Sequence, residues 1–293
     1  MNINGEVKRT KKQVFLAMIA VLMAFSIALM GCSSNEKTEE TENQSPAQAE
    51  SIELSIFAAN SLEKAMPEVQ ALYAQNHENV SFSDAQFKAS GDLVAQLEGG
   101  ATADVLITAS SATMDNAEKS DLIKVDSRVD MFANDLVVVR GEGSSVEITG
   151  LNDVESESIN RIAIGDGALV PAGTYANQSL SSVGLYTSDT GKDGQYAPSI
   201  ADKVALADKV GTAAQYVASG DCQIGFVYSS DVYRYNGIEV AYVTPSDSHK
   251  TILYPGAVCE KSAQAEAAQD FLDFCLNDPK AQAIWASYGF ELV

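Results

Sequence analysis

Histidine is scarce in this 293-residue chain, although it is the residue that most often binds metals in proteins. Only His77 and His249 are present, and neither lies at ligand spacing from a cysteine or from the other histidine. Zinc sites are built from imidazole and thiolate groups at short, regular spacing. The sequence therefore predicts no zinc site.

Cysteine is also rare, with four residues in the whole chain. Cys32 ends an apolar leader, so Cys222, Cys259 and Cys275 are left for the folded part. Because three is an odd number, at most one disulfide bond can form among them. We expect these three residues to be buried thiols that pack as small apolar side chains.

Basic residues are few: 19 Lys and Arg stand against 40 Asp and Glu, and the formal net charge is −21. Residues 1–31 hold four basic residues and one acidic residue, so their removal would change this charge to −24. A protein this acidic repels nucleic acid and anionic lipid. We therefore expect no nucleic-acid partner, although neutral dipoles could still hold a small anion.

Residues 33–51 lack aromatic and branched aliphatic side chains altogether. Such a segment cannot bury enough apolar surface to offset the entropy of the chain. We expect a flexible linker over 32–51 and a folded part that begins near Ile52. The roughly 240 residues that follow suffice for one large domain or two small lobes.

The N-terminus carries a leader. A basic start, Lys8–Lys12, precedes the apolar run Val14–Met30, and Leu29-Met30-Gly31 leads directly into Cys32. The run is short and ends in a cleavage-type sequence, which indicates a secretory signal peptide over 1–31. This ending resembles a bacterial lipobox, in which Cys32 is acylated and anchors the mature protein outside the cytoplasmic membrane. A single transmembrane anchor is the alternative.

Short β-type runs alternate with helical patterns after the linker, which predicts an α/β fold. The expected strands are 52–57, 80–82, 104–107, 135–139, 161–164, 203–206 and 224–228. The expected helices begin near 62, 90 and 111 and cover 175–183, 210–217, 264–276 and 279–288. Asn60, with Glu63 three residues on, is expected to cap the first helix. Trp285 and Phe290 are expected as apolar anchors, and Thr187–Tyr196 as an exposed loop.

Several expected strand-to-helix junctions consist of small and hydroxyl residues, namely 60–61, 90–91, 171–174 and 210–212. A helix start has unpaired backbone N–H groups and the positive end of the helix dipole, so it can bind an anion without a basic side chain. Hydroxyl groups add further donors. Each junction alone is more often an ordinary cap, and spacing does not show whether they converge.

The sequence resembles the substrate-binding proteins of molybdate ABC transporters, collinearly from Ile52 to Phe290. The matching segments are IFAANSLEKAM (56–66), FKASGDLVAQLEGGATADVLITAS (87–110), NDLVVV (134–139), IAIGDGALVPAGTYANQSL (162–180), GFVYSSD (225–231), DSHKTILYPGAV (247–258), FLDF (271–274) and YGF (288–290). The resemblance implies a protein that is not an enzyme, that needs no cofactor, and whose metal arrives as an oxyanion.

The resemblance also implies the residues that hold the oxyanion. Ser61 and Ser90 would contribute hydroxyl and backbone N–H groups, Ala172 and Val210 backbone N–H groups from helix starts, and Tyr228 its phenol.

Three features depart from the family pattern. Asn60 replaces the small residue expected before Ser61. Asp92 would repel a dianion if it faced the site, so we expect its side chain to point away. The segment 187–199 is longer than expected and has no evident role. Lys88 and Lys209, which flank two site residues, are expected to be solvated surface lysines.

The fold that the resemblance implies is a two-lobed periplasmic-binding-protein fold of the second type, α/β, each lobe a central mixed sheet flanked by helices. Lobe I would comprise 52–131 plus 246–293, and lobe II 132–245. Donors from both lobes would contact the oxyanion together and stabilise the closed state. A membrane permease would then recognise this loaded form, and we expect the protein to be a monomer.

Cavity size would separate molybdate and tungstate from sulfate, and donor-only binding would disfavour protonated phosphate. The sequence does not separate molybdate from tungstate. One alternative keeps this fold but binds sulfate, phosphate or a small organic acid. Another is a hydrolase that uses Ser61 or Ser90 as nucleophile and His249 as base, although no GxSxG motif is present. A purely structural surface protein is the third.

Overall fold

The structure is a computed structural model that describes residues 51–293. The expected signal peptide, Cys32 and the linker up to residue 50 lie outside the described residues. The described residues belong to one compact unit, and the clusters of buried apolar side chains lie within it. This part of the chain therefore has its own hydrophobic core, as an independent domain does. Among its helices, none combines the length and the apolar character needed to cross a bilayer.

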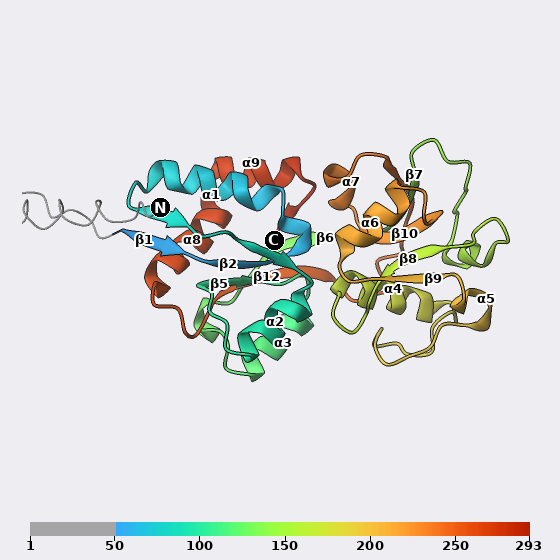
Figure 1. The fold of residues 1–293 in the computed structure, drawn as a ribbon, viewed down its shortest axis with the longest axis horizontal. Helices are drawn as coiled ribbons and strands as arrows, with labels where there is room; N and C mark the ends of the chain where they lie inside the picture. The colour runs from blue at the N-terminus through green and yellow to red at the C-terminus, as the bar shows by residue number, and fades with distance from the viewer. Residues whose placement is uncertain (1–50) are drawn as a thin grey trace, which may run out of the picture. The chain divides into compact units, whose positions relative to one another are not determined.

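The first of two mixed sheets has six strands, and we call this sheet with its helices lobe I (Figure 1). Its strand order is β13 (Glu291–Leu292), β6 (Val129–Asn134), β12 (Ile252–Val258), β5 (Val105–Ile107), β2 (Ile56–Ala59) and β4 (Gln86–Lys88). Helices α1 (Ala65–Asn76), α8 (Ala265–Asn277) and α9 (Pro279–Ser287) cover one face, and α2 (Ser90–Glu98) and α3 (Ser111–Lys119) the other. Strands β1 (Ile52–Leu54) and β3 (Val80–Phe82) form a separate parallel pair, and η1 (Asn60–Leu62) and η2 (Val125–Ser127) are 3-10 turns.

The second mixed sheet has five strands and, with its helices, is called lobe II. Its order is β11 (Ile238–Val243), β7 (Leu136–Gly141), β10 (Ile224–Tyr228), β8 (Ile162–Gly165) and β9 (Val204–Ala207). Helix α4 (Pro171–Ser182) lies on one face and α6 (Val210–Ala218) on the other (Figure 1). The shorter elements are η3 (Leu151–Glu155), α5 (Pro198–Ala201) and α7 (Asp231–Arg234). The expected fold class, α/β with two helix-flanked mixed sheets, is therefore confirmed.

The single strand expected over 52–57 is two strands, β1 and β2, which join different sheets. They separate at Ser55, whose N–H and hydroxyl donate to Asp104 Oδ2 at 2.7 and 3.0 Å. Asp104 Oδ1 also accepts from the Ser262 hydroxyl at 2.6 Å. The buried carboxylate of Asp104 thus accepts the hydrogen bond from the Ser55 N–H that a continuous strand would make to its neighbour. The alternation of apolar and polar residues over 52–57 does not reveal this contact.

Helix α4 begins four residues before the expected start, at Pro171. Proline is well placed at a first helical position because its N–H would have no partner there. The early start depends on Gly173, where a Cβ atom would lie 1.8 Å from the carbonyl oxygen of Gly165 in β8. Glycine therefore lets the first turn of α4 pack directly on the strand.

The chain passes between the two sheets twice. Strand β6 pairs with β12 as far as Asn134, opposite Ile252, and β7 starts at Leu136. The expected boundary between residues 131 and 132 therefore falls inside β6, three residues before this strand ends. The return lies between β11 and β12, where Thr244 Oγ1 donates to the Leu136 carbonyl at 2.9 Å. The two crossing segments are thus tied to each other.

The predictions for the C-terminal helices and for the cysteines are confirmed. Trp285 and Phe290 are buried, and their rings lie 4.7 and 5.4 Å from that of Phe132. The cysteines Cys222, Cys259 and Cys275 are free and buried. Burial raises the pKa of the Cys259 thiol to about 12, which keeps it protonated and unreactive at neutral pH.

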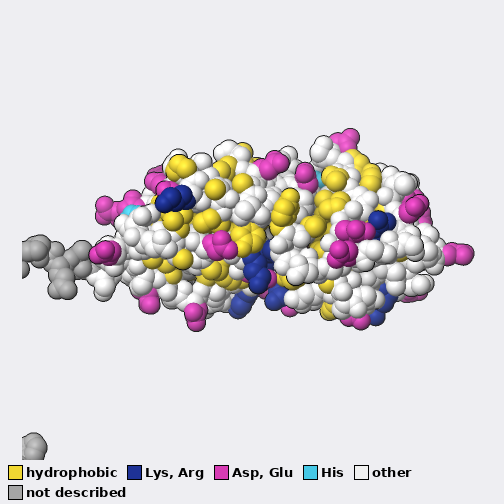
Figure 2. All heavy atoms as spheres, turned by 90° about the horizontal axis from the view of Figure 1, so that it is seen from above, with side chains coloured by type: hydrophobic (Ala, Val, Ile, Leu, Met, Phe, Trp, Pro, Cys, Tyr) yellow, Lys and Arg dark blue, Asp and Glu magenta, His cyan; other side chains and the backbone are white. Residues whose placement is uncertain are grey.

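The charges on the surface are unevenly distributed. On the face shown in Figure 2, Lys and Arg side chains gather near the middle of the described part, whereas Asp and Glu are scattered along it. A local basic region can attract an anion to an otherwise acidic protein.

Candidate functional site

A small cavity lies where elements of the two lobes meet. It is lined by Ala59, Asn60, Ser61, Lys88, Ala89, Ser90, Ala109, Val170, Pro171, Ala172, Val210 and Tyr228. All five residues expected to bind an oxyanion are among them. The cavity leaves about 10 Å³ for the centre of a water-sized group. That is about the room one water molecule needs, so only a small ligand in direct contact with the lining could be held here.

The strand ends explain why these segments meet. Strands β2, β4 and β5 are parallel neighbours in the six-stranded sheet, and the residues that follow them line the cavity. Ligands of open α/β sheets bind outside the carboxyl ends of the strands, where the connecting loops diverge. The cavity occupies this position in lobe I and faces the corresponding end of β10, Tyr228, in lobe II.

Three helices begin at the cavity without a side-chain cap. The residues at the N-cap positions of α2, α4 and α6 are Ala89, Val170 and Lys209, and none forms a capping hydrogen bond. By contrast, the Ser110 hydroxyl caps α3 in the usual way. The first N–H groups of a helix have no intrahelical acceptor. The three helix starts can therefore direct backbone donors and positive dipole ends at an anion.

Hydroxyl groups complete the lining. The Ser61 hydroxyl is 3.0 Å from that of Tyr254, and Ser90 Oγ accepts from the Ala109 N–H at 3.0 Å. Ser90 keeps its own proton for donation, because that bond uses only an oxygen lone pair. Tyr228 Oη reaches the Ala109 carbonyl at 3.5 Å, a long and weak contact. The phenol can therefore turn to a better acceptor.

Both buried phenols are neutral. Burial raises the pKa of Tyr228 and of Tyr254 well above the usual value for tyrosine, and the proximity of the two rings acts in the same direction for Tyr228. Their ring centroids lie 5.6 Å apart. At neutral pH each therefore offers an O–H donor rather than a negative charge.

These raised pKa values predict a loss of stability in alkali. As the pH rises past about 10, the unfolded chain releases phenolic protons that the folded chain retains. The free energy of unfolding should then fall by up to about 1.4 kcal/mol per pH unit for each buried tyrosine. Urea unfolding between pH 8 and 11 measures this, and Tyr254→Phe should reduce the slope. The same urea midpoint at pH 8 and at pH 11 would contradict the prediction.

The charged residues near the cavity behave mostly as expected. Among the residues that line it, in the described part of the chain, only Lys88 is charged, and its exposed Nζ donates to Gln96 Oε1 at 3.1 Å. Lys209 is half-buried, which is compatible with a surface lysine whose stem packs on the protein, so its solvation stays a prediction. Asp92 is not among the lining residues, in agreement with the expectation that it points away.

The expected capping role of Asn60 is wrong. Helix α1 begins at Ala65, and its N-cap residue Lys64 forms no side-chain cap. The Asn60 side chain instead donates to Glu63 Oε2 at 2.8 Å and accepts, through Oδ1, from the N–H of Gly211 at 3.0 Å. Asn60 therefore connects the end of β2 to the start of α6 in the other lobe, which local sequence spacing does not indicate.

The geometry does not support a hydrolase. His249 does not line the cavity, and its Nδ1 lies 2.8 Å from the carbonyl oxygen of Lys250. Ser61 and Ser90 are hydrogen-bonded to Tyr254 and to a backbone N–H, respectively. A nucleophilic serine needs a base within hydrogen-bond reach, and neither serine has such a partner in residues 51–293.

The long segment 187–199 borders a second, larger hollow of about 730 Å³ rather than the small cavity. Thr190 and Lys192 line this hollow together with parts of α2, α3 and α4. The loop predicted over 187–196 is confirmed as largely exposed, although Gly191 within it is buried and accepts from the Asn177 side chain at 3.0 Å. The hollow is lined by both acidic and basic residues, Glu98, Asp115, Lys119 and Lys250 among them. This mixture does not favour ligands of either charge.

Two residues that support the site were not singled out from the sequence. Tyr254, in β12, is fully buried and is hydrogen-bonded to Ser61. Asp231, at the start of α7, accepts from the Tyr228 N–H at 2.9 Å and pairs with Arg234. Both lie inside the matching segments quoted above, but only the folded chain shows what they contact.

A family model described as bacterial extracellular solute-binding protein matches residues 54–291. The molybdate-binding protein ModA of Escherichia coli (strain K12) is 32% identical over 250 residues, 84% of this chain and 91% of that protein. In Bacillus subtilis (strain 168), the protein named "Putative ABC transporter substrate-binding lipoprotein YvgL" is 27% identical over 274 residues, 93% of this chain and 96% of that one.

One solved structure is similar to this chain in both fold and sequence. It is described as the "substrate binding domain of putative molybdenum ABC transporter from Clostridium difficile". Its TM-score is 0.62 at 33% identity, and the match covers 83% of this chain and 100% of that one.

Proposed function

The chain belongs to the bacterial extracellular solute-binding proteins, and from this premise we propose that it captures molybdate between its two lobes for an ABC transporter. The observation that carries the proposal is the convergence of uncapped helix starts and hydroxyl groups on one small cavity. Two of the three relatives described above, ModA of E. coli and the domain from Clostridium difficile, are named for molybdate or molybdenum. Extracytoplasmic solute capture follows from the family itself.

The five residues predicted from the sequence are proposed as the oxyanion ligands. Ser61 and Ser90 would donate from lobe I, and Ala172, Val210 and Tyr228 from lobe II. Molybdate carries two negative charges at neutral pH, which neutral N–H and O–H dipoles can stabilise when several point at one centre. Because both lobes supply donors, the bound ion would favour the closed arrangement by its difference in affinity for the two states.

Four finer points are part of the proposal. Tungstate, which has the same shape and charge, is expected to bind as well. The loaded, closed protein is expected to dock on a permease, and acylation of Cys32 would hold it at the membrane. We expect it to act as a monomer, since the cavity is complete within one chain.

Calorimetric titration of the chain from Ser33 onward tests the proposal. Molybdate and tungstate are expected to release heat and to raise the melting temperature. Sulfate and phosphate are expected to bind more weakly, sulfate because it is smaller and hydrogen phosphate because its O–H would need an acceptor. Tighter binding of sulfate than of molybdate would mean that sulfate is the substrate. The absence of heat with all four oxyanions would refute oxyanion binding.

Removing single hydroxyl groups is expected to weaken binding measurably. Ser61→Ala, Ser90→Ala and Tyr228→Phe should each reduce molybdate affinity by about 1–3 kcal/mol, the range for one buried hydrogen-bonding group left without its partner. The same titration measures this loss. Ser182→Ala is a matched control, because that hydroxyl bonds the Ser179 carbonyl at 2.7 Å, away from the cavity. Unchanged affinity in all three site variants would exclude these residues as ligands.

A further inference from the structure

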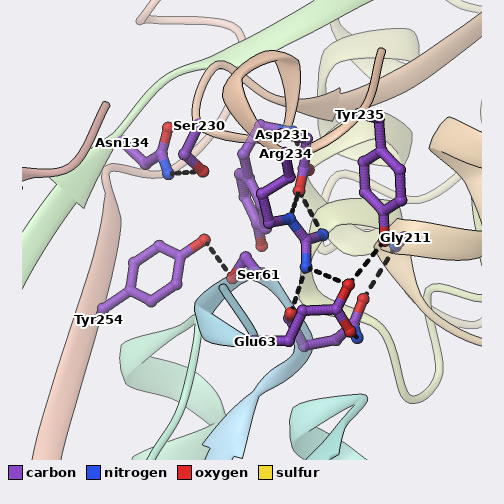
Figure 3. A network of polar contacts seen from close by, with 11 residues as sticks. Ser61, Glu63, Asn134, Gly211, Ser230, Asp231, Arg234, Tyr235 and Tyr254 are labelled. Carbon is purple, nitrogen blue, oxygen red and sulfur yellow. Dashed lines mark hydrogen bonds and ion pairs between the residues drawn. The ribbon is translucent and has the colours of Figure 1, made fainter. Parts of the chain in front are cut away.

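A network of polar groups joins the two lobes beside the cavity (Figure 3). It begins at Asn60, the residue that departs from the family pattern. Its Oδ1 accepts from the Gly211 N–H of lobe II at 3.0 Å, while its Nδ2 donates to Glu63 Oε2 of its own lobe at 2.8 Å. One amide side chain therefore bridges the lobes and orients the carboxylate of Glu63.

The carboxylate of Glu63 then receives two groups from lobe II. Arg234 Nη1 lies 3.2 Å from Glu63 Oε1, and the Tyr235 hydroxyl donates to the same oxygen at 3.0 Å. Arg234 Nη1 also donates to the main-chain carbonyl of Asn60. The Arg234 side chain is only 1% exposed, so water barely screens these interactions.

The chain leaves room for this contact at one glycine. A Cβ atom on Gly211 would lie 2.3 Å from Tyr235 Oη and 2.6 Å from Asn60 Oδ1. Any larger residue would push both groups away from the start of α6. The absence of a side chain at Gly211 is therefore what permits the close approach of Asn60.

The network also touches the site residues. Asn60 directly precedes Ser61, and Gly211 directly follows Val210. Asp231, which forms a 2.6 Å ion pair with Arg234, accepts from the Tyr228 N–H at 2.9 Å. Formation of the network therefore requires the same approach of the lobes that brings the proposed ligands together.

We propose that Asn60, Glu63 and Arg234 form a latch between the lobes, which favours the closed arrangement whether or not an oxyanion is bound. They act as positioning residues, through contacts between the lobes. A larger closed fraction lowers the apparent dissociation constant by the same factor. This effect on affinity rests on the proposed function, whereas the bias toward closure does not.

The chain offers closely matched variants for a test. Glu63→Gln keeps the size of the side chain but removes its charge, and Tyr235→Phe removes only the hydroxyl that binds it. The controls are Glu68→Gln and Tyr288→Phe, because the Tyr288 hydroxyl donates to Glu68 at 2.5 Å entirely within lobe I. Asn60→Ala restores a small residue before Ser61, so this variant is expected to fold.

Two measurements on the chain from Ser33 onward decide the matter. In the protein without added oxyanion, hydrogen exchange of the peptide that contains Gly211 should be about ten-fold faster in Asn60→Ala and Glu63→Gln than in the controls. Molybdate affinity should fall by a similar factor, about ten-fold, which corresponds to the loss of one good hydrogen bond. Tyr235→Phe should shift both quantities in the same direction.

The possible outcomes separate the two proposals. Exchange rates equal to those of the controls would overturn the latch, whatever the affinity. Faster exchange with unaltered molybdate affinity would overturn its contribution to binding. Faster exchange in a protein that binds no molybdate at all would support the latch and refute the proposed function.

Discussion

Replacing Val210 with proline is expected to weaken molybdate binding about a hundred-fold and to leave the melting temperature nearly unchanged. Proline lacks the backbone N–H and puts a ring carbon in its place. An oxygen of the bound ion would then face a methylene group, a loss of about 3 kcal/mol, since hydrogen bonds to charged groups are among the strongest. Calorimetry and thermal unfolding of the same preparation measure both quantities.

The fold should accept this substitution. Val210 is the first residue of α6, a position at which proline is favoured. Lys209 before it is extended, with φ −157° and ψ 161°, the conformation that proline requires of its predecessor. Binding and folding are therefore separable at this residue.

Ser111→Pro is the matched control. Ser111 is the first residue of α3, and Ser110 before it is likewise extended, with φ −162° and ψ 142°. Helix α3 does not begin at the cavity, so molybdate affinity should not change. Equal losses of affinity in both variants would mean that the substitution acts through the fold, and no loss in Val210→Pro would remove α6 from the site.

Much of the fold is local enough to be predicted from the sequence. Strand β10 over Ile224–Tyr228 and helix α9 from Pro279 match the prediction because their apolar residues follow one clear period and have clear boundaries. The prediction failed at Ser55, where a buried carboxylate 49 residues away divides the strand. It also failed at the start of α4, whose small residues carry no helical period and pack on β8.

The site was predictable only in part. Four helix starts that suit an anion were recognisable from small and hydroxyl residues, and the resemblance selected one residue at each and added Tyr228, which ends β10. Their convergence depends on contacts between distant segments, such as that of Asn60 with Gly211 across 151 positions. The contact of Tyr254 with Ser61, which lies 193 positions earlier, could not be predicted for the same reason. Local propensity does not contain such pairings, so Asn60 was assigned to the nearest helix instead.

Replacing Asp231 with alanine is expected to destabilise the protein by about 3–5 kcal/mol, the cost of removing one partner of a buried ion pair. Asp231 is 0% exposed, and its Oδ1 lies 2.6 Å from Arg234 Nη2 and 3.0 Å from Nε. Burial raises the pKa of Asp231, and the positive charge of Arg234 opposes that rise. Without the carboxylate, Arg234 would keep Glu63 as its one charged partner among residues 51–293. Urea unfolding at neutral pH measures the change.

The exposed ion pair of Arg128 with Asp115 provides the contrast. It is nearly as short, at 2.7 Å, but the Asp115 side chain is 48% exposed. Asp115→Ala should therefore cost at most about 1 kcal/mol, because water reaches this pair and Arg128 keeps Glu118 as a partner at 2.7 Å. Similar losses in Asp115→Ala and Asp231→Ala would show that burial does not set the cost.

The double variant Asp231→Ala, Arg234→Met separates stability from function. A buried ion pair contributes little net stability compared with apolar residues of similar volume, so removing both charges should restore much of what Asp231→Ala loses. The same double variant lacks the guanidinium that reaches Asn60 and Glu63 across the lobes. It should therefore bind molybdate more weakly than the original chain even where its stability is recovered. Recovered stability together with full affinity would mean that the buried pair serves the fold of lobe II alone.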